Sequence, residues 1–232
     1  MNRLLSASLI ALTLAAGASP KVVAQSPALQ KGISVELAPT SNATTVPAAD
    51  NADASIVTVT DNGSVYFGTD LVTPATLADE MKSRPRDRQQ KLYIKADARA
   101  PFANVQRVLE AARDTFIEAP VLLTSQPERS APGTVTPPEG LEVLVSPALP
   151  AGTVATVVEL FNSRQQPPML KVNNDQIPWS ALQSTLMQHF QKGDEKVILL
   201  KADRQLSFAQ VVRVIDTCRS TGAKIVLVTA GM

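Results

Sequence analysis

Hydrophobic and polar residues alternate along much of the chain in patterns that predict short strands and amphipathic helices. Residues 56–60 alternate and are rich in β-branched side chains, which predicts a strand, and residues 65–67 predict its partner. Asp-Asn-Gly at 61–63 lies between them, and Asn-Gly favours a hairpin turn. Apolar runs at 92–95 and 121–123 predict two more strands.

Two helices are predicted among these strands. Thr73 and Pro74 favour the start of the first helix, because threonine caps helices and proline suits the first helical position. Leu77 and Met81 share its apolar face. The second helix is predicted over residues 102–115, where an apolar stripe follows helical spacing. The stripe consists of Val105, Val108, Leu109 and Ala112.

The same order of elements recurs about 106 residues later. Leu-Tyr-Ile-Lys-Ala-Asp at 92–97 is echoed by Ile-Leu-Leu-Lys-Ala-Asp at 198–203, and Phe102 is echoed by Phe208. Upstream, Gly-Ile-Ser-Val at 32–35 resembles Gly-Leu-Glu-Val at 140–143. A period this long predicts two copies of one small folded unit rather than a solenoid.

The second copy repeats the signals of the first. Ser207 and Gln210 have the spacing of a capping box, and Gly222 suits the end of the helix that follows. Its predicted strands are 154–160, 169–172, 197–200 and 225–228, and its first helix carries Leu182, Leu186 and Phe190. Each copy therefore has the order ββαβαβ. This order predicts an α+β fold with two helices on one face of a small mixed sheet.

Proline-rich stretches and an apolar start complete the predicted organisation. Arg3 followed by the apolar run 4–16 is typical of a secretory signal peptide. The run is short for a membrane-spanning helix, so cleavage is favoured over an uncleaved anchor. The predicted segments are a signal peptide (1–24), an extended linker (25–53) with a short strand at 33–37, copy one (54–126), a proline-rich linker (127–153) with a short strand at 141–145, and copy two (154–232).

Composition narrows the function. Without residues 1–24 the chain has 20 basic and 21 acidic residues, which argues against a nucleic-acid footprint. The single cysteine excludes an intrachain disulfide, and the single histidine excludes a histidine-based metal cluster. Cys218 falls on the apolar stripe of its helix, which predicts a small buried residue. We expect no cofactor.

Copy two resembles the periplasmic domain of the ExbD/TolR family. The resemblance rests on Lys-Ala-Asp at 201–203, the aromatic-led run 208–212, and Thr-Gly-Ala-Lys-Ile-Val-Leu-Val-Thr at 221–229. Copy one matches more loosely through 95–97, 102–109 and 121–124. The resemblance implies a periplasmic setting in a TonB- or Tol-type system. Implied partners are an ExbB/TolQ-type channel, a TonB/TolA-type protein, a membrane-anchored ExbD, or peptidoglycan.

One family feature has no counterpart here. The family's proton carrier is an aspartate inside a membrane helix, whereas Glu36 is the first acidic residue of this chain. The leading hypothesis is therefore a non-enzymatic, exported binding protein. Two alternatives stay open: a membrane-anchored motor subunit with an uncleaved N-terminal helix, and a periplasmic enzyme or ligand-binding protein. Because a unit of about 70 residues is marginally stable alone, we also predict that the two copies pair within the chain.

The residues singled out lie at strand ends and edges. Asp97 and Asp203 are either partner contacts or Asx turns, and the turn is favoured. Lys95 and Lys201 either bind an acidic partner or are solvated charges.

Trp179 either fastens the start of its helix to the sheet or anchors a partner. The short predicted strands contribute Ile33, Val35, Leu141 and Val143 as candidates for pairing at a sheet edge.

Overall fold

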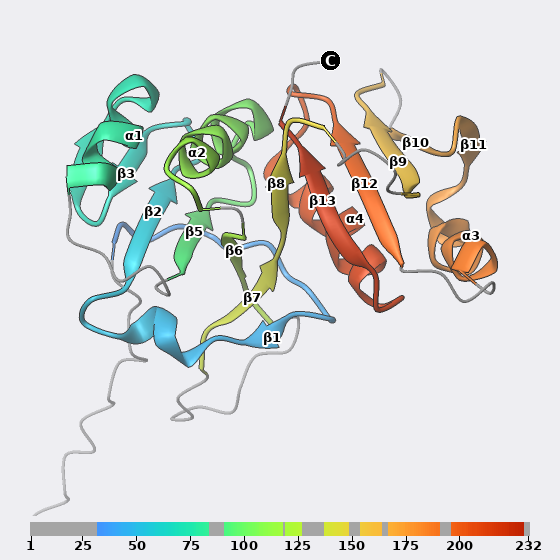
Figure 1. Ribbon diagram of the computed structural model, residues 1–232, viewed down its shortest axis with the longest axis horizontal. Coiled ribbons are helices and arrows are strands. Elements are labelled where there is room, and N and C mark those ends of the chain that lie inside the picture. Colours follow the sequence, from blue (N-terminus) through green and yellow to red (C-terminus); the bar gives the residue numbers. More distant parts are fainter. Residues whose placement is uncertain are drawn as a thin grey trace, which may run out of the picture.

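The chain forms two mixed sheets that lie side by side, each flanked by its own helices (Figure 1). The computed structural model describes residues 32–83, 91–117, 119–126, 137–148, 154–163, 167–190 and 196–229. The predicted signal peptide lies outside these residues. No helix in the described ranges combines the length and the apolar character needed to cross a bilayer.

The first sheet has seven strands in the order β1-β7-β6-β5-β2-β3-β4. Its strands are β1 (Thr44–Thr45), β2 (Ser55–Val59), β3 (Val65–Phe67), β4 (Asp70–Val72), β5 (Leu92–Ala96), β6 (Val121–Thr124) and β7 (Glu139–Glu142). Strands β2, β5 and β6 are parallel, and the other pairings are antiparallel. The helices are η1 (a 3₁₀ helix, Pro47–Asp50), α1 (Pro74–Ser83) and α2 (Phe102–Asp114).

The second sheet has six strands in the order β11-β10-β9-β12-β13-β8. Its strands are β8 (Leu144–Ser146), β9 (Thr156–Phe161), β10 (Met169–Val172), β11 (Asp175–Ile177), β12 (Val197–Ala202) and β13 (Lys224–Val228). The helices are η2 (a 3₁₀ helix, Trp179–Ala181), α3 (Leu182–His189) and α4 (Phe208–Arg219). Strands β9, β12, β13 and β8 are parallel. The predicted α+β class and the repeated arrangement are confirmed.

Local signals in the sequence form the structures they predict. Thr73 Oγ1 accepts the N–H of Thr76 at the start of α1, and Ser207 and Gln210 form the capping box of α4. Gly63 has φ +83° at the predicted hairpin turn. Cys218 is fully buried, and burial raises the pKa of its thiol to about 12, so the residue is a neutral part of the core at neutral pH.

The short predicted strands differ from expectation. Residues 33–37 form no strand; Leu37 makes one isolated bridge to Asp97. The predicted strand at 141–145 divides at Val143, because its first part pairs with β6 of the first sheet and its second part with β13 of the second. Each copy also has an unpredicted third strand, β4 or β11, which is only three residues long.

The two copies dock through the starts of their second helices. Phe102 N–H donates to Leu206 C=O at 2.8 Å, and Phe208 N–H donates to Ala100 C=O at 2.9 Å. Phe208 lies 106 residues after Phe102, and Ala100 lies 106 residues before Leu206, so exchanging the copies turns the first bond into the second. The two bonds are therefore related by a local pseudo-twofold axis.

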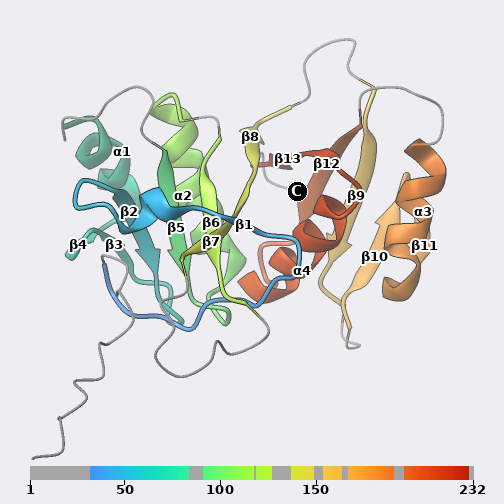
Figure 2. The same ribbon diagram turned by 90° about the horizontal axis from the view of Figure 1, so that it is seen from below.

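A second pair of bonds follows the same rule. Ala103 N–H donates to Arg204 C=O at 3.1 Å, and Ala209 N–H donates to Ala98 C=O at 2.9 Å. Pro101 and Ser207 form a bridge at the centre of this contact. Seen from below, α2 lies with the strands of copy one and α4 with the strands of copy two (Figure 2). The predicted pairing of the copies is therefore present in the structure.

The copies share one apolar core. A single cluster of buried side chains runs from Val57 and Leu109 in copy one through Val145 to Phe208 and Leu227 in copy two. The opposite face of the first sheet is covered by the segment before β2, where Val46, Ala49 and Ala54 pack on its outer side chains. The outer side chains are Ile56, Tyr93, Val121 and Leu123.

The docking contact predicts a specific effect of proline at the start of α2. Ala103→Pro removes the N–H that donates to Arg204 C=O but leaves α2 intact, since proline is tolerated in the first helical turn. We expect the free energy of unfolding, measured with urea, to fall by about 1 kcal/mol more than for the control Ala75→Pro. Ala75 is exposed at the same position of α1, so equal losses would show that the bond to copy two contributes nothing.

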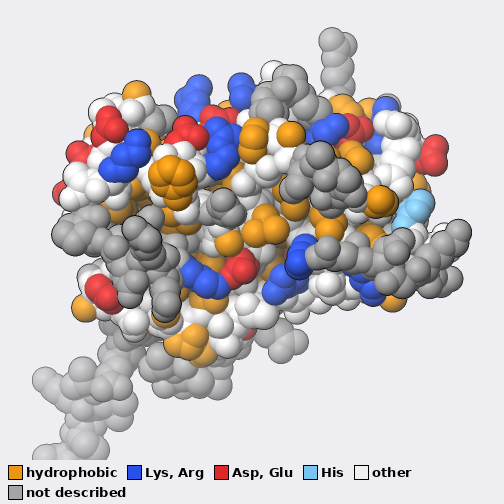
Figure 3. Space-filling view, in the orientation of Figure 1, with side chains coloured by type: hydrophobic (Ala, Val, Ile, Leu, Met, Phe, Trp, Pro, Cys, Tyr) orange, Lys and Arg blue, Asp and Glu red, His pale blue; other side chains and the backbone are white. Residues whose placement is uncertain are grey.

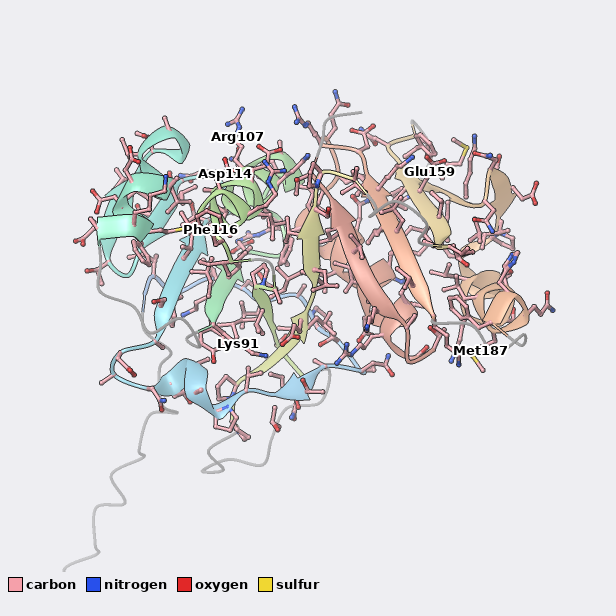
Figure 4. The ribbon with its side chains drawn as sticks, viewed as in Figure 1. Lys91, Arg107, Asp114, Phe116, Glu159 and Met187 are labelled. Carbon is pink, nitrogen blue, oxygen red and sulfur yellow. The ribbon has the colours of Figure 1, made fainter. Side chains whose placement is uncertain are left out.

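The ends of α2 and α4 predict a stabilising substitution. Phe116 has φ +63° and is 91% exposed, and its equivalent in copy two is Gly222 with φ +72° (Figure 4 labels Phe116 beside the end of α2). Left-handed backbone is unfavourable for residues with a Cβ atom. Phe116→Gly should raise the free energy of unfolding by about 0.5–1 kcal/mol, and Gly222→Ala should lower it by a similar amount. A destabilised Phe116→Gly variant would contradict this.

Candidate functional site

The repeated Lys-Ala-Asp motif lies where the central strand of each sheet ends. Asp97 Oδ1 accepts the N–H of Arg99 at 3.0 Å, and Asp203 Oδ1 accepts the N–H of Gln205 at 2.8 Å. Both aspartates therefore form the Asx turns that the sequence favours. Each aspartate also donates its own N–H to the neighbouring parallel strand, Asp97 to Val59 C=O in β2 and Asp203 to Leu160 C=O in β9.

In copy one an extended segment of the chain lies across this strand end. Glu36 N–H donates to Asp97 Oδ2 at 3.1 Å, and Glu36 C=O accepts the N–H of Ala98 at 2.7 Å. The segment then passes Ser125 beyond β6, whose N–H donates to Ala38 C=O and whose C=O accepts the N–H of Thr40. It is thus held between the ends of β5 and β6. The predicted partner residues Ile33 and Val35 are half-buried in the same segment.

The carboxylate of Asp97 is ionised and buried. Burial disfavours its charge, but hydrogen bonds from the side chain and N–H of Arg99 and from the N–H of Glu36 outweigh that effect and hold the pKa below its usual value. Arg99 Nε lies 3.0 Å from Asp97 Oδ1, and Arg99 Nη2 lies 3.6 Å from the exposed Asp61 Oδ2. The charged groups of this strand end are therefore bonded to one another and to the docked segment. A cavity of about 430 Å³ lies beside them, lined by Ser34, Val35, Glu36, Thr60, Asp61, Asp97 and Arg99.

Lys95 is buried beneath the segment that precedes β2. Only 5% of the residue is exposed. Of its two interpretations, a solvated charge at the strand end is therefore wrong. Burial lowers the pKa of its ammonium group, and the nearby Asp50 opposes that shift. Its counterpart Lys201 is half-buried, with Nζ 3.3 Å from Glu159 Oε1.

In copy two the strand end contains a cavity of about 250 Å³. It is lined by Gln106, Phe161, Lys201, Ala202, Asp203, Arg204, Gln205 and Val228. Gln106 comes from α2, so this cavity lies where the two copies meet. Arg204 Nε donates to Gln106 Oε1 at 3.3 Å, and Gln106 Nε2 donates to Thr229 C=O at 2.7 Å.

Some of these residues were not anticipated from the sequence. Gln106 is buried in an otherwise apolar helix face, and its equivalent in copy two is Val212. A polar residue that interrupts a repeated apolar position is a readable signal. Phe161 and Arg204 carry no comparable pattern, because they come together only when β9 and β12 pair in the sheet of copy two.

The other predicted residues serve the fold. Leu141 and Val143 are each 1% exposed within the strand that joins the two sheets. Trp179 Nε1 donates to Pro168 C=O at 2.7 Å, and Arg213 lies 5.0 Å above its ring. Trp179 could either hold the start of its helix against the sheet or anchor a partner, and this geometry matches the first role.

Charge on the surface is mixed. On the face shown in Figure 3, Lys and Arg side chains are interspersed with Asp and Glu and with apolar side chains, and no broad single-sign area is present there. In the described ranges, no three His, Cys, Asp or Glu residues come together as a metal site would require.

Comparisons with known proteins point to one family. The family model described as biopolymer transport protein ExbD/TolR matches residues 22–127 and, a second time, residues 114–231. The two matches cover both copies of the repeat. No curated protein matches the chain.

The bonds around Asp97 predict an acid-sensitive contact. Asp97→Asn keeps one acceptor but places an N–H donor where the N–H of Glu36 or the Arg99 side chain is bonded. We expect the free energy of unfolding at pH 7 to fall by about 1–3 kcal/mol, and that of the control Asp61→Asn to change little because that pair is exposed.

The pH dependence follows from the lowered pKa of Asp97. A group whose folded-state pKa is below the unfolded value of about 3.9 stabilises the fold above that pH and loses the effect as the pH falls through its folded-state pKa. The difference between wild type and Asp97→Asn should therefore shrink below about pH 4. A difference that stays constant to pH 2 would contradict this role of the charge.

Proposed function

Because the chain belongs to the ExbD/TolR family of biopolymer transport proteins, we propose that it is a non-enzymatic periplasmic component of a TonB- or Tol-type energy-transduction system that binds a partner protein or peptidoglycan. The observation that carries this proposal is the double family match over two docked copies. Each match covers a whole repeat, so the resemblance extends well beyond a short motif.

A binding role also agrees with the chemistry of the strand ends. Their carboxylates are engaged in turns and their cations in ion pairs: Asp97 with Arg99, and Lys201 with Glu159. These are positioning interactions, and neither the carboxylates nor the lysines are arranged as a nucleophile with a general base. The partners we propose are a TonB/TolA-type protein, an ExbB/TolQ-type channel or a membrane-anchored ExbD, with peptidoglycan as the non-protein ligand.

The proposal is tested by photocrosslinking of the full chain in cells that contain the Ton and Tol systems. Photoreactive residues are placed at exposed positions on different elements: Leu71, Phe116, Asn162 and Gln188. We expect adducts that contain one of the proposed proteins, identified by mass spectrometry and lost when its gene is deleted, or co-sedimentation of the chain with purified peptidoglycan. Absence of adducts from all positions together with absence of sedimentation would refute the proposed function.

A further inference from the structure

The two strand ends are equivalent in sequence but differ in what occupies them. In copy one, Glu36 bonds through its backbone to Asp97 Oδ2 and to the N–H of Ala98. The equivalent groups in copy two are the carboxylate of Asp203 and the N–H of Arg204. Asp203 Oδ2 receives only a long contact of 3.4 Å from Asn162 N–H, and no described residue accepts the N–H of Arg204.

The corresponding chain segment of copy two lies along the last strand, where Ser146 C=O accepts the N–H of Thr229 as Ala38 C=O accepts that of Ser125, but it forms no bond to Asp203 or Arg204. Residues 36–38 correspond to 144–146 in the repeat of 108 positions that relates Gly32 to Gly140. Residues 144–146 form β8, which pairs with β13 along Val226–Val228 at the sheet edge. They therefore do not cross the end of β12 as residues 36–38 cross the end of β5, and the cavity of about 250 Å³ lies at this place.

One acceptor that holds the docked segment in copy one is already occupied in copy two. In copy one, Ser125 C=O accepts the N–H of Thr40, which belongs to the docked segment. In copy two the equivalent Thr229 C=O accepts Nε2 of Gln106 from α2 at 2.7 Å. Arg113 Nη1 also donates to Thr229 Oγ1 at 2.7 Å. These contacts hold the end of β13 in place. They do not involve the carboxylate of Asp203 or the N–H of Arg204, which are the groups that a bound segment would use.

We propose that this cavity binds an extended segment of a partner protein, in the way that residues 36–38 bind copy one. The segment's N–H donates to Asp203 and its C=O accepts from the N–H of Arg204, as in recognition of peptides by strand addition. Aliphatic or small side chains, like those of Leu37 and Ala38, contact Phe161 and Val228. This inference rests on the proposed function, since it takes the partner to be a protein.

A partner is favoured over a second copy of this chain. The segment that a second copy would offer, residues 36–40, is held by five hydrogen bonds between its backbone and Asp97, Ala98 and Ser125 of its own copy one. Insertion into a neighbouring cavity would first have to break those bonds. A free extended peptide has no such cost beyond its ordering.

The test uses the peptide Gly-Ile-Ser-Val-Glu-Leu-Ala-Pro-Thr-Ser, which has the sequence of residues 32–41, with blocked ends. It is added to the ¹⁵N-labelled full chain and followed by NMR. We expect saturable shifts of the amide signals of Arg204, Gln205 and Phe161. Signals of Ala98 and Arg99 should not move, because their site is occupied.

Two variants test the bonding. Asp203→Asn keeps the acceptor for the N–H of Gln205 but loses the charged acceptor offered to the peptide, and should weaken binding about tenfold. Phe161→Ala removes an apolar contact from a half-buried position and should weaken binding several-fold. Asp175→Asn removes the same charge from an exposed hairpin of copy two and should leave binding unchanged. The dispersion of the NMR spectrum confirms that each variant is folded.

Four results would overturn the inference: no saturable shifts at millimolar peptide, shifts centred on Asp97 and Ala98, equal affinity of Asp203→Asn and wild type, or dimerisation of the free chain with the same cavity signals shifting on dilution. The last would assign the cavity to a second copy. A chain that crosslinks to a Ton or Tol protein but ignores the peptide would refute this docking mode and leave the proposed function standing.

Discussion

The first amide groups of α2 and α4 have no acceptor within their own helices, and this constraint shapes the whole molecule. The first four N–H groups of any helix need partners from outside it. Here Phe102 and Ala103 find theirs in the turn of copy two, and Phe208 and Ala209 find theirs in the turn of copy one. Each copy thus completes the helix of the other. The two copies then behave as halves of one structure, with one continuous core between them.

The shared core also gives a reason for duplication within one chain. A unit of this size buries only about 60% of the surface of its unfolded chain and is marginally stable. Joining two units makes their association intramolecular, so the interface forms at a high effective concentration. Once joined, the copies were free to differ at equivalent positions. Val212 corresponds to the buried Gln106, and Gly222 corresponds to the exposed Phe116. The strand ends differ in the same way, because Glu36 bonds to Asp97 and Ala98 in copy one, whereas no described residue accepts the N–H of Arg204 in copy two.

The sequence predicted what depends on neighbouring residues. The turn at Gly63, the capping box of Ser207 and the buried Cys218 each follow from residues a few positions apart, and the structure confirms them. It did not predict what depends on distant segments. Lys95 is an ordinary strand residue until the chain before β2 folds over it, and the strand at 141–145 divides because two sheets compete for it. The cavity was missed for the same reason, since Gln106 and Arg204 meet only after docking.

The central claim is that the two copies cap each other's helices, and native-state hydrogen exchange tests it directly. The readout is the free energy of opening at the amides of Phe102, Ala103, Phe208 and Ala209, which begin their helices and would be unprotected in separate copies. The account predicts that all four are protected nearly as strongly as core amides such as that of Leu200. Exchange as rapid as that of the exposed Ala75 amide, at the same place in α1, would contradict it.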